Sequence, residues 1–188
     1  MARWTGTLLL CVTLLQILRM TTTFPKGAPE SACEDMMPHH TGIKPQPGLA
    51  PYTIQVSVSS FETGVPVAVR IQGPDYGGLL LEARVPGSTN ALGSWQVPPE
   101  NTKFLQCSGN PQGAITHANI NPKNKETVYM WTPTSSNCSI QFVATVAQDR
   151  QVYWLNVTSE MLRGRAAETG EGRLVLLSSL LLTLLSSR

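Results

Sequence analysis

Short segments in which apolar and polar residues alternate constrain the fold of this chain more than any other feature. Every second residue is apolar in residues 52–59, and the same period of two returns in residues 65–72. This period is typical of a β-strand with one buried face. Gly73-Pro74-Asp75 then predicts a turn. Further strands are expected at residues 79–85, 93–97, 104–107, 114–118, 127–131 and 140–156.

The number and spacing of these segments predict an all-β domain. Strands that recur about every 8–12 residues, with turn-forming residues between them, are typical of a β-sandwich. Gly and Pro are abundant, with 15 and 14 residues, which agrees with a turn-rich β protein. Residues 24–51 have no sustained period and are expected to form an irregular arm. The domain is expected to span residues 24–158.

The N-terminal end of the chain predicts export. A basic start at Arg3 precedes an apolar run of eleven residues, 8–18. This run has the length of a signal-peptide core and is well short of the ~20 residues that span a bilayer. Cleavage is expected near residues 21–23, so that residues 1–23 form the signal peptide. The alternative is an uncleaved, buried helix.

The C-terminal end predicts a lipid anchor. Residues 174–185 are almost all apolar, and as a helix they would reach only ~18 Å, too short for a ~30 Å hydrocarbon core. Their length fits the removable signal for a glycosylphosphatidylinositol (GPI) anchor, with residues 159–173 as a polar spacer and Gly164 as the attachment site. Residues 174–188 would form the apolar tail. The alternative is a plain apolar terminal helix or tail.

Charge and motifs exclude several classes of function. The net charge is only +2, and the 14 Lys and Arg residues are scattered, so no nucleic-acid partner is expected. No Gly-x-Ser-x-Gly motif or glycine-rich phosphate loop occurs. We therefore expect a protein that is not an enzyme and has no cofactor.

The cysteines and the sequons agree with an oxidising compartment. Cys11 lies in the predicted signal, which leaves Cys33, Cys107 and Cys138. Two of these three are expected to pair and one to stay unmatched. Asn137 and Asn156 begin Asn-x-Ser/Thr sequons, so both are candidate N-glycosylation sites in exposed positions.

Three histidines are weak candidates for a metal site. His39, His40 and His117 could come together if the arm lies near residue 117, with Glu34 or Asp35 as a further candidate ligand. Adjacent histidines in a strand point to opposite faces, and the spacing is not diagnostic of a metal site. We therefore expect no metal, and surface or hydrogen-bonding roles for these histidines.

Two other groups of side chains have a structural interpretation. The aromatic residues could form a recognition patch, but alternation places most of them on strands, where core packing is expected. Glu82 and Arg84 share one strand face and predict a solvated or cross-strand ion pair.

Several segments, in order along the chain, together resemble the reelin-type (reeler) domain family. The run Tyr76-Gly77-Gly78-Leu79-Leu80-Leu81-Glu82-Ala83-Arg84 is similar to the most recognisable strand of that family. The other matches are Phe24-Pro25-Lys26-Gly27 with Ser31-Ala32-Cys33, Met37-Pro38-His39-His40-Thr41-Gly42, Leu105-Gln106-Cys107, Ile115-Thr116-His117, Trp131-Thr132-Pro133 and residues 142–154. The pattern is similar to the N-terminal domain of ferric-chelate reductase-like proteins and to short insect defence proteins.

The resemblance implies an immunoglobulin-like sandwich of about 7–9 antiparallel strands. It also implies a disulfide between Cys33 and Cys107. Cys138 matches a third cysteine of some members, whose partner follows the last strand, but no cysteine follows Trp154 here. Cys138 is then free, capped or paired with another chain as a disulfide-linked dimer. A buried reduced thiol is the alternative.

These observations together predict an extracellular binding module. It would be secreted or held on the outer leaflet by the GPI anchor, its only contact with a membrane, and its partner would be a protein, a glycan or a microbial surface. The alternative is a soluble innate-immune defence protein that binds microbial surfaces. The sequence contains no haem-binding or electron-transfer domain like those of the ferric-reductase relatives, so no reductase activity is expected.

Overall fold

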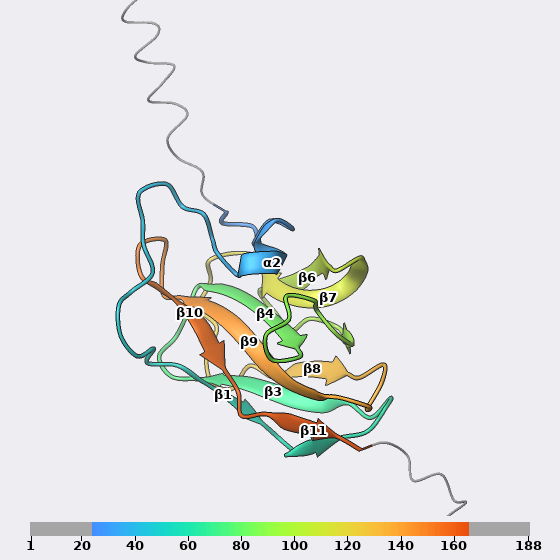
Figure 1. Ribbon diagram of the computed structural model, residues 1–188. Helices are drawn as coiled ribbons and strands as arrows, with labels where there is room; N and C mark the ends of the chain where they lie inside the picture. Colours follow the sequence, from blue (N-terminus) through green and yellow to red (C-terminus); the bar gives the residue numbers. More distant parts are fainter. Residues whose placement is uncertain (1–23, 166–188) are drawn as a thin grey trace, which may run out of the picture.

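Two β-sheets pack face to face in the computed structural model, which describes residues 24–165 (Figure 1). The predicted signal peptide, most of the predicted spacer and the apolar tail lie outside the described residues. The smaller sheet has the strand order β1-β3-β8-β5. Its strands are β1 (Thr53–Val56), β3 (Val67–Gln72), β5 (Ser94–Trp95) and β8 (Tyr129–Thr132).

The larger sheet has the order β2-β11-β9-β4-β7-β6, and β10 also pairs with β9. All its pairs are antiparallel except β2 with β11, which is parallel. Its strands are β2 (Ser60–Phe61), β4 (Gly78–Arg84), β6 (Thr102–Cys107), β7 (Asn110–His117), β9 (Ser139–Ala147), β10 (Tyr153–Thr158) and β11 (Leu162–Gly164).

The alternation of the sequence becomes the core between the sheets. In β3, Val67, Val69 and Ile71 are buried, and the residues between them are partly exposed. Aromatic side chains fill the centre, where the ring centroids of Trp131 and Phe142 lie 5.3 Å apart at 90°. Such edge-to-face packing suits the charge distribution of aromatic rings. The fold class predicted from the sequence, an all-β sandwich, is confirmed.

Strand β4 is buried on both faces, which explains its continuous apolar run. One face, with Leu79, Leu81 and Ala83, belongs to the core between the sheets. The other face, which begins with Leu80, lies under the N-terminal arm (residues 24–50) and its short helix α2 (Ala32–Asp35). The arm therefore adds a partial third layer over the outer face of the larger sheet.

Several contacts hold the arm on this sheet. The disulfide joins Cys33 of α2 to Cys107 of β6. Hydrogen bonds join the arm to β4, β7, β9 and β10: Arg84 to the Cys33 carbonyl, Ala28 N to Thr116 Oγ1 at 2.9 Å, Thr145 Oγ1 to Met36 O at 2.6 Å, and Gln46 N to Tyr153 O at 2.8 Å. These contacts fix the arm at several points along its length.

Several strand ends shift by a few residues, and the strands differ most from the sequence prediction in three places. Residues 140–156 form two strands, β9 and β10, because Asp149 accepts hydrogen bonds from Gln151 N and Val152 N and closes a turn between them. The two-residue strand β2 was not predicted. With β11, the described chain has eleven strands.

The third difference corrects the predicted boundary of the domain. A polar spacer was expected from residue 159, but Leu162–Gly164 forms β11, and Leu162 is buried in the core. Ser159 is also buried, and its hydroxyl accepts a hydrogen bond from Phe142 N. The prediction that this segment lies outside the fold is wrong, because one buried leucine in a short strand has too little periodicity to be recognised.

Candidate functional site

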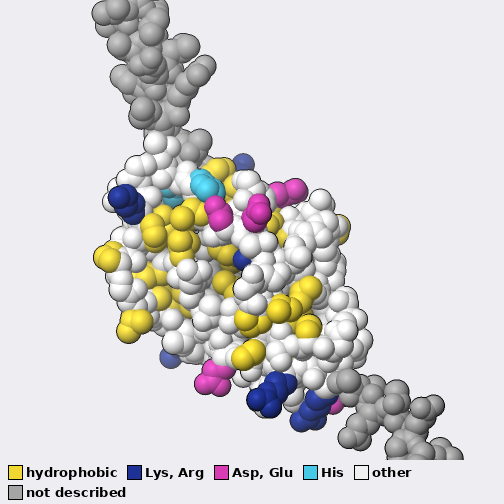
Figure 2. Space-filling view, viewed as in Figure 1, with side chains coloured by type: hydrophobic (Ala, Val, Ile, Leu, Met, Phe, Trp, Pro, Cys, Tyr) yellow, Lys and Arg dark blue, Asp and Glu magenta, His cyan; other side chains and the backbone are white. Residues whose placement is uncertain are grey.

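An apolar cleft lies between the N-terminal arm and the larger sheet. Its volume is about 520 Å³, within the usual range of roughly 300–1,000 Å³ for ligand sites. The arm supplies one wall, which includes Phe24, Ala28 and Met36. The ends of β4, β7 and β9 supply the other, which includes Leu80 and Ala147. Figure 2 shows hydrophobic side chains gathered below the arm on this face of the molecule. We call this site the arm cleft.

Two glycines at the start of β4 bring the backbone close to its neighbours in the arm cleft. A Cβ at Gly77 would lie 3.2 Å from the carbonyl oxygens of Gln148 and Ile120. A Cβ at Gly78 would lie 3.0 Å from the Cβ of Ala147. These distances are tighter than ordinary van der Waals contact, so the glycines serve the packing of the cleft wall as well as the turn.

His117 closes the inner end of the arm cleft through backbone contacts. Its Nε2 lies 2.8 Å from Phe24 O, and its Nδ1 lies 3.2 Å from Leu79 N. A neutral ring with the proton on Nε2 donates to the first and accepts from the second. Burial lowers the pKa of His117, with Lys123 and Lys103 adding to the shift, while the backbone carbonyls of Phe24 and Leu79 oppose it. His117 therefore ties the start of the arm to the sheet.

The rim of the cleft carries two charged side chains at the β9–β10 turn, Asp149 and Arg150. Asp149 Oδ1 accepts the two backbone hydrogen bonds of the turn, at 2.7 and 3.0 Å. Arg150 is exposed and has no hydrogen bond or ion pair with the described residues. The rim thus offers a guanidinium group to solvent beside an apolar cavity.

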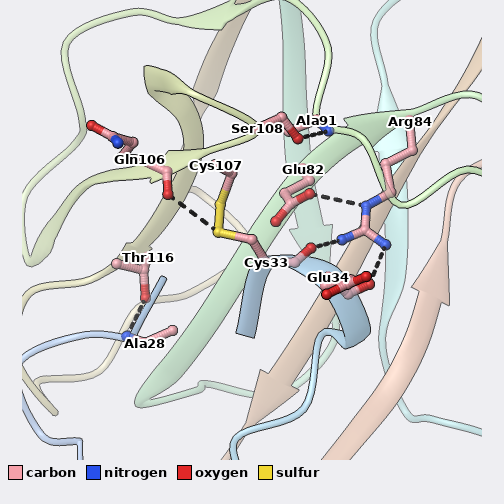
Figure 3. Close-up of a disulfide and its surroundings, with 10 residues drawn as sticks. All are labelled: Ala28, Cys33, Glu34, Glu82, Arg84, Ala91, Gln106, Cys107, Ser108 and Thr116. Atoms are coloured by element: carbon pink, nitrogen blue, oxygen red, sulfur yellow. Dashed lines mark hydrogen bonds and ion pairs between the residues drawn. A yellow bond between two sulfur atoms is a disulfide. The ribbon is translucent and has the colours of Figure 1, made fainter. Parts of the chain in front are cut away.

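Glu82 and Arg84 form an ion pair under the arm, with Arg84 Nε 2.9 Å from Glu82 Oε2 (Figure 3). The two side chains are only 0% and 8% exposed, so the expected solvated or cross-strand pair is wrong. Both residues lie in β4, and the pair is buried because helix α2 covers this face of the strand. Arg84 also donates hydrogen bonds to the carbonyls of Cys33 and Glu34. Burial raises the pKa of Glu82 to about 7, although Arg84 acts in the opposite direction.

The three histidines do not form one cluster of ligand atoms, although His40 and His117 both line the arm cleft and both contact Phe24. His39 Nε2 lies 2.9 Å from Asp35 Oδ2 on the surface. His40 stacks on Phe24 with ring centroids 6.0 Å apart, and His117 bonds to the backbone. Among residues 24–165, the single group of three or more His, Cys, Asp or Glu residues with ligand atoms within 4.8 Å of one another is Cys33, Glu82 and Cys107. Two of these sulfur atoms form the disulfide, so this group offers no thiolate ligand.

Lys123 is buried in a way that sequence reasoning missed. Its ammonium group donates to three backbone carbonyls: Gly77 at 2.8 Å, Asn119 at 3.0 Å and Asn121 at 2.8 Å. Burial lowers the pKa of Lys123 to about 8. The side chain holds the loop after β7 against the start of β4, next to the cleft. No pattern around a single lysine predicts this role.

Most aromatic residues pack in the core, as predicted. Trp95, Trp131 and Tyr129 are at most 1% exposed. The hydroxyls of Tyr76 and Tyr129 share a buried hydrogen bond of 2.8 Å, and burial raises the pKa of Tyr76 to about 12. Tyr153 is also buried, and its ring forms part of the cleft wall.

The remaining predicted site residues lie near the far end of the larger sheet or on its surface. Cys138 is partly exposed, packs against the core and forms no disulfide with a described cysteine. Asn137 and Asn156 are exposed, as sequon positions require. Gly164 lies in β11, where its N–H donates to Cys138 O at 3.0 Å and a Cβ would lie 2.6 Å from that oxygen. Packing therefore requires a glycine here, and its role as an anchor site stays a prediction.

The arm cleft was not predicted from the sequence. Its walls come from segments more than 20 residues apart, and residues 24–51 have no period that would indicate a cavity. One signal was present: Gly77 and Gly78 occur together at the start of a buried strand, where close approach of another group is one explanation. Among the described residues, no helix is long and apolar enough to cross a bilayer.

Comparisons with known proteins agree on one family. The family model for the Reeler domain matches residues 31–170. Defense protein 3 of Antheraea mylitta is 37% identical over 154 residues, which cover 79% of this chain and 91% of that protein. Ferric-chelate reductase 1 of Homo sapiens is 30% identical over 155 residues, which cover 81% of this chain and 26% of the reductase.

A solved structure agrees in fold. The human F-spondin reeler domain superposes with a TM-score of 0.51 at 16% identity, covering 66% of this chain and 96% of that domain. At this identity the likeness concerns the fold alone. Since the Reeler domain model matches most of the sequence and a relative of similar length is 37% identical, the chain belongs to the Reeler domain family.

Proposed function

We propose that this protein is an extracellular recognition module, not an enzyme, and that it binds its target in the arm cleft. The arm cleft itself carries the proposal: it is an apolar cavity of about 520 Å³ between an arm and a sheet that several contacts hold together. A preformed concave site with apolar walls and few polar groups is typical of binding.

The ionisable groups support binding rather than catalysis. Among the described residues, the buried charged side chains are Glu82, Arg84 and Lys123. Glu82 pairs with Arg84, and Lys123 bonds to three carbonyls. His117 contacts the backbone through both ring nitrogens. Each of these groups has a structural partner, so none is placed to transfer a proton to a bound ligand.

We also propose that the module works outside the cell, secreted or held by a GPI anchor. The disulfide between Cys33 and Cys107 is of the kind that persists in oxidising compartments. Treatment of intact expressing cells with phosphatidylinositol-specific phospholipase C tests the anchor. Release of the protein into the medium supports an anchored module, whereas protein already free in untreated medium contradicts the anchor.

A second candidate function is a soluble defence protein that binds microbial surfaces. It is supported by relatives named as defense proteins, which match this chain over about nine-tenths of their own length. The test is co-sedimentation of the purified full chain with intact bacteria and, separately, with host cells. Binding to bacteria alone favours defence, and binding to host cells alone favours a cell-surface receptor. If the protein binds neither bacteria nor host cells, both candidate functions are contradicted.

Cys138 belongs to this proposal as the site of a disulfide-linked dimer. Its side chain is partly exposed, lies next to the exposed Asn137, and has no disulfide partner among the described residues. A non-reducing gel of protein from the medium should show a dimer that Cys138→Ser lacks. Monomer alone for both proteins would contradict the dimer.

A further inference from the structure

We propose that the arm cleft holds the hydrocarbon chain of an anionic amphiphile, with the negatively charged head group at Arg150. The ligand class is therefore a single acyl chain that ends in a carboxylate or a phosphate. The inference rests on the proposed function, since it names the ligand of the same cleft.

The inside of the cleft has little to offer a polar ligand. Thr145 Oγ1 donates to Met36 O at 2.6 Å, and Tyr153 Oη donates to Ile43 O at 3.3 Å. His117 contacts Phe24 and Leu79 through its two nitrogens. A ligand with polar groups in this space would lose its hydrogen bonds to water without replacing them, which weakens binding. A hydrocarbon chain has no such loss.

The walls suit a flexible chain rather than one rigid shape. Met36 and Met37 lie side by side in the arm wall, and methionine adapts to irregular apolar surfaces because its side chain is unbranched and polarisable. Across the cleft, Gly77 and Gly78 present backbone with no side chain. Ile120, 71% exposed, extends the apolar surface to the rim. Such an exposed isoleucine would gain burial when a chain fills the cleft.

The rim determines the charge of the head group. Asp149 and Arg150 are its charged side chains, and Asp149 uses one carboxylate oxygen to close the β9–β10 turn. Arg150 has no partner among the described residues. A guanidinium group pairs well with a carboxylate or a phosphate, because both accept two parallel hydrogen bonds. The charge at the rim therefore favours an anionic head group over a neutral one.

The position of the cleft relative to the C-terminal side of the domain bears on whether the ligand comes from solution or from the membrane that carries the anchor. The arm with α2 and the C-terminal strand β11 lie at opposite ends of the sandwich (Figure 1). A chain anchored through its C-terminal side would hold the arm cleft away from its own membrane. The amphiphile would then come from solution, not from the bilayer that carries the anchor.

Titration calorimetry of the full chain with octanoate, decanoate and dodecanoate tests the proposal. We expect one site, with the affinity rising about fourfold for each added methylene, since a buried methylene contributes about 0.8 kcal/mol. Dodecanol serves as the neutral probe and should bind more weakly than dodecanoate. Vesicles of anionic phospholipid serve as the bilayer probe and should bind less than free dodecanoate at equal lipid concentration.

Two matched pairs of variants locate the site. Ile120→Gln should weaken dodecanoate binding about fivefold, while Val97→Gln, at an exposed position outside the cleft, should leave it unchanged. Arg150→Gln should weaken binding of dodecanoate about fivefold and leave binding of dodecanol unchanged. Arg163→Gln, at the exposed position of β11 and outside the cleft, is its control. The melting temperature of each variant shows that it is folded.

Three results would overturn the proposal: no binding of dodecanoate, an affinity that does not depend on chain length, or equal affinities for wild type and both cleft variants. Equal binding of dodecanol and dodecanoate would overturn the anionic head group. If bacteria or host cells still bind the protein in that case, the ligand class fails while the recognition function stands. If the protein binds dodecanoate but neither bacteria nor host cells, the ligand class stands while the recognition of cells fails.

Discussion

At the scale of single residues, Glu82 is the most unusual group in the protein. It is fully buried, and its Oε1 has no hydrogen-bond partner, while Oε2 pairs with Arg84. A buried carboxylate with one unsatisfied oxygen is costly in its charged form. The raised pKa of about 7 follows from this burial, and it makes the stability of the fold depend on pH.

We predict that Glu82→Gln removes a pH-dependent part of the stability. Between pH ~4.5 and pH ~7 the folded state binds more protons at Glu82 than the unfolded state does, so the free energy of unfolding falls as the pH rises through this window. The Gln variant lacks this fall. Urea unfolding of both proteins between pH 5 and pH 8 measures it, with Glu126→Gln as an exposed control. If the wild type instead gains stability relative to the Gln variant as the pH rises, the attraction of Arg84 outweighs burial and lowers the pKa of Glu82.

At the scale of elements, the arm depends on its disulfide. Cys33 and Cys107 are 74 residues apart. A disulfide that closes a loop of this length lowers the entropy of the unfolded chain, which stabilises the fold by about 4–5 kcal/mol. We predict that the double variant Cys33→Ala, Cys107→Ala loses about this much unfolding free energy in urea. Cys138→Ser is the control for loss of a cysteine outside the disulfide. An unchanged midpoint for the double variant would mean that the hydrogen bonds hold the arm alone.

Strand β11 gives a second prediction at this scale. Leu162 is 2% exposed and belongs to the main core, whereas its neighbour Met161 is 60% exposed. We expect Leu162→Ala to cost about 2–5 kcal/mol of unfolding free energy, and Met161→Ala to cost less than about 0.5 kcal/mol. Equal, small effects of both substitutions in thermal or urea unfolding would contradict the packing of β11 and support the spacer predicted from the sequence.

The elements also show what the sequence can predict. Residues 65–72 alternate cleanly because one face of β3 meets the core and the other meets solvent, so this strand was predicted nearly to its ends. β4 was predicted as a buried strand, but its cover was not, because an irregular arm leaves no period in the sequence. The burial of Glu82 and Arg84 was therefore not predicted, because two charged residues on one face of a strand normally indicate that this face is exposed to solvent.

At the scale of the whole molecule, the arm and the sandwich together form a site that neither has alone. The sandwich was predictable from local alternation, since each strand carries its own pattern. The arm cleft was not, because its walls meet only through contacts between distant segments, such as the one between Thr145 and Met36. The same contacts hold the arm and its helix α2 at the end of the molecule opposite β11 (Figure 1).

The most direct test of the account is binding of the full chain to its target cells with the cleft altered. Wild type, Ile120→Gln and Val97→Gln are compared in co-sedimentation with bacteria and with host cells. We expect wild type and Val97→Gln to bind the same cells to the same extent, and Ile120→Gln to bind about fivefold more weakly. Equal binding by all three folded proteins would contradict recognition through the arm cleft.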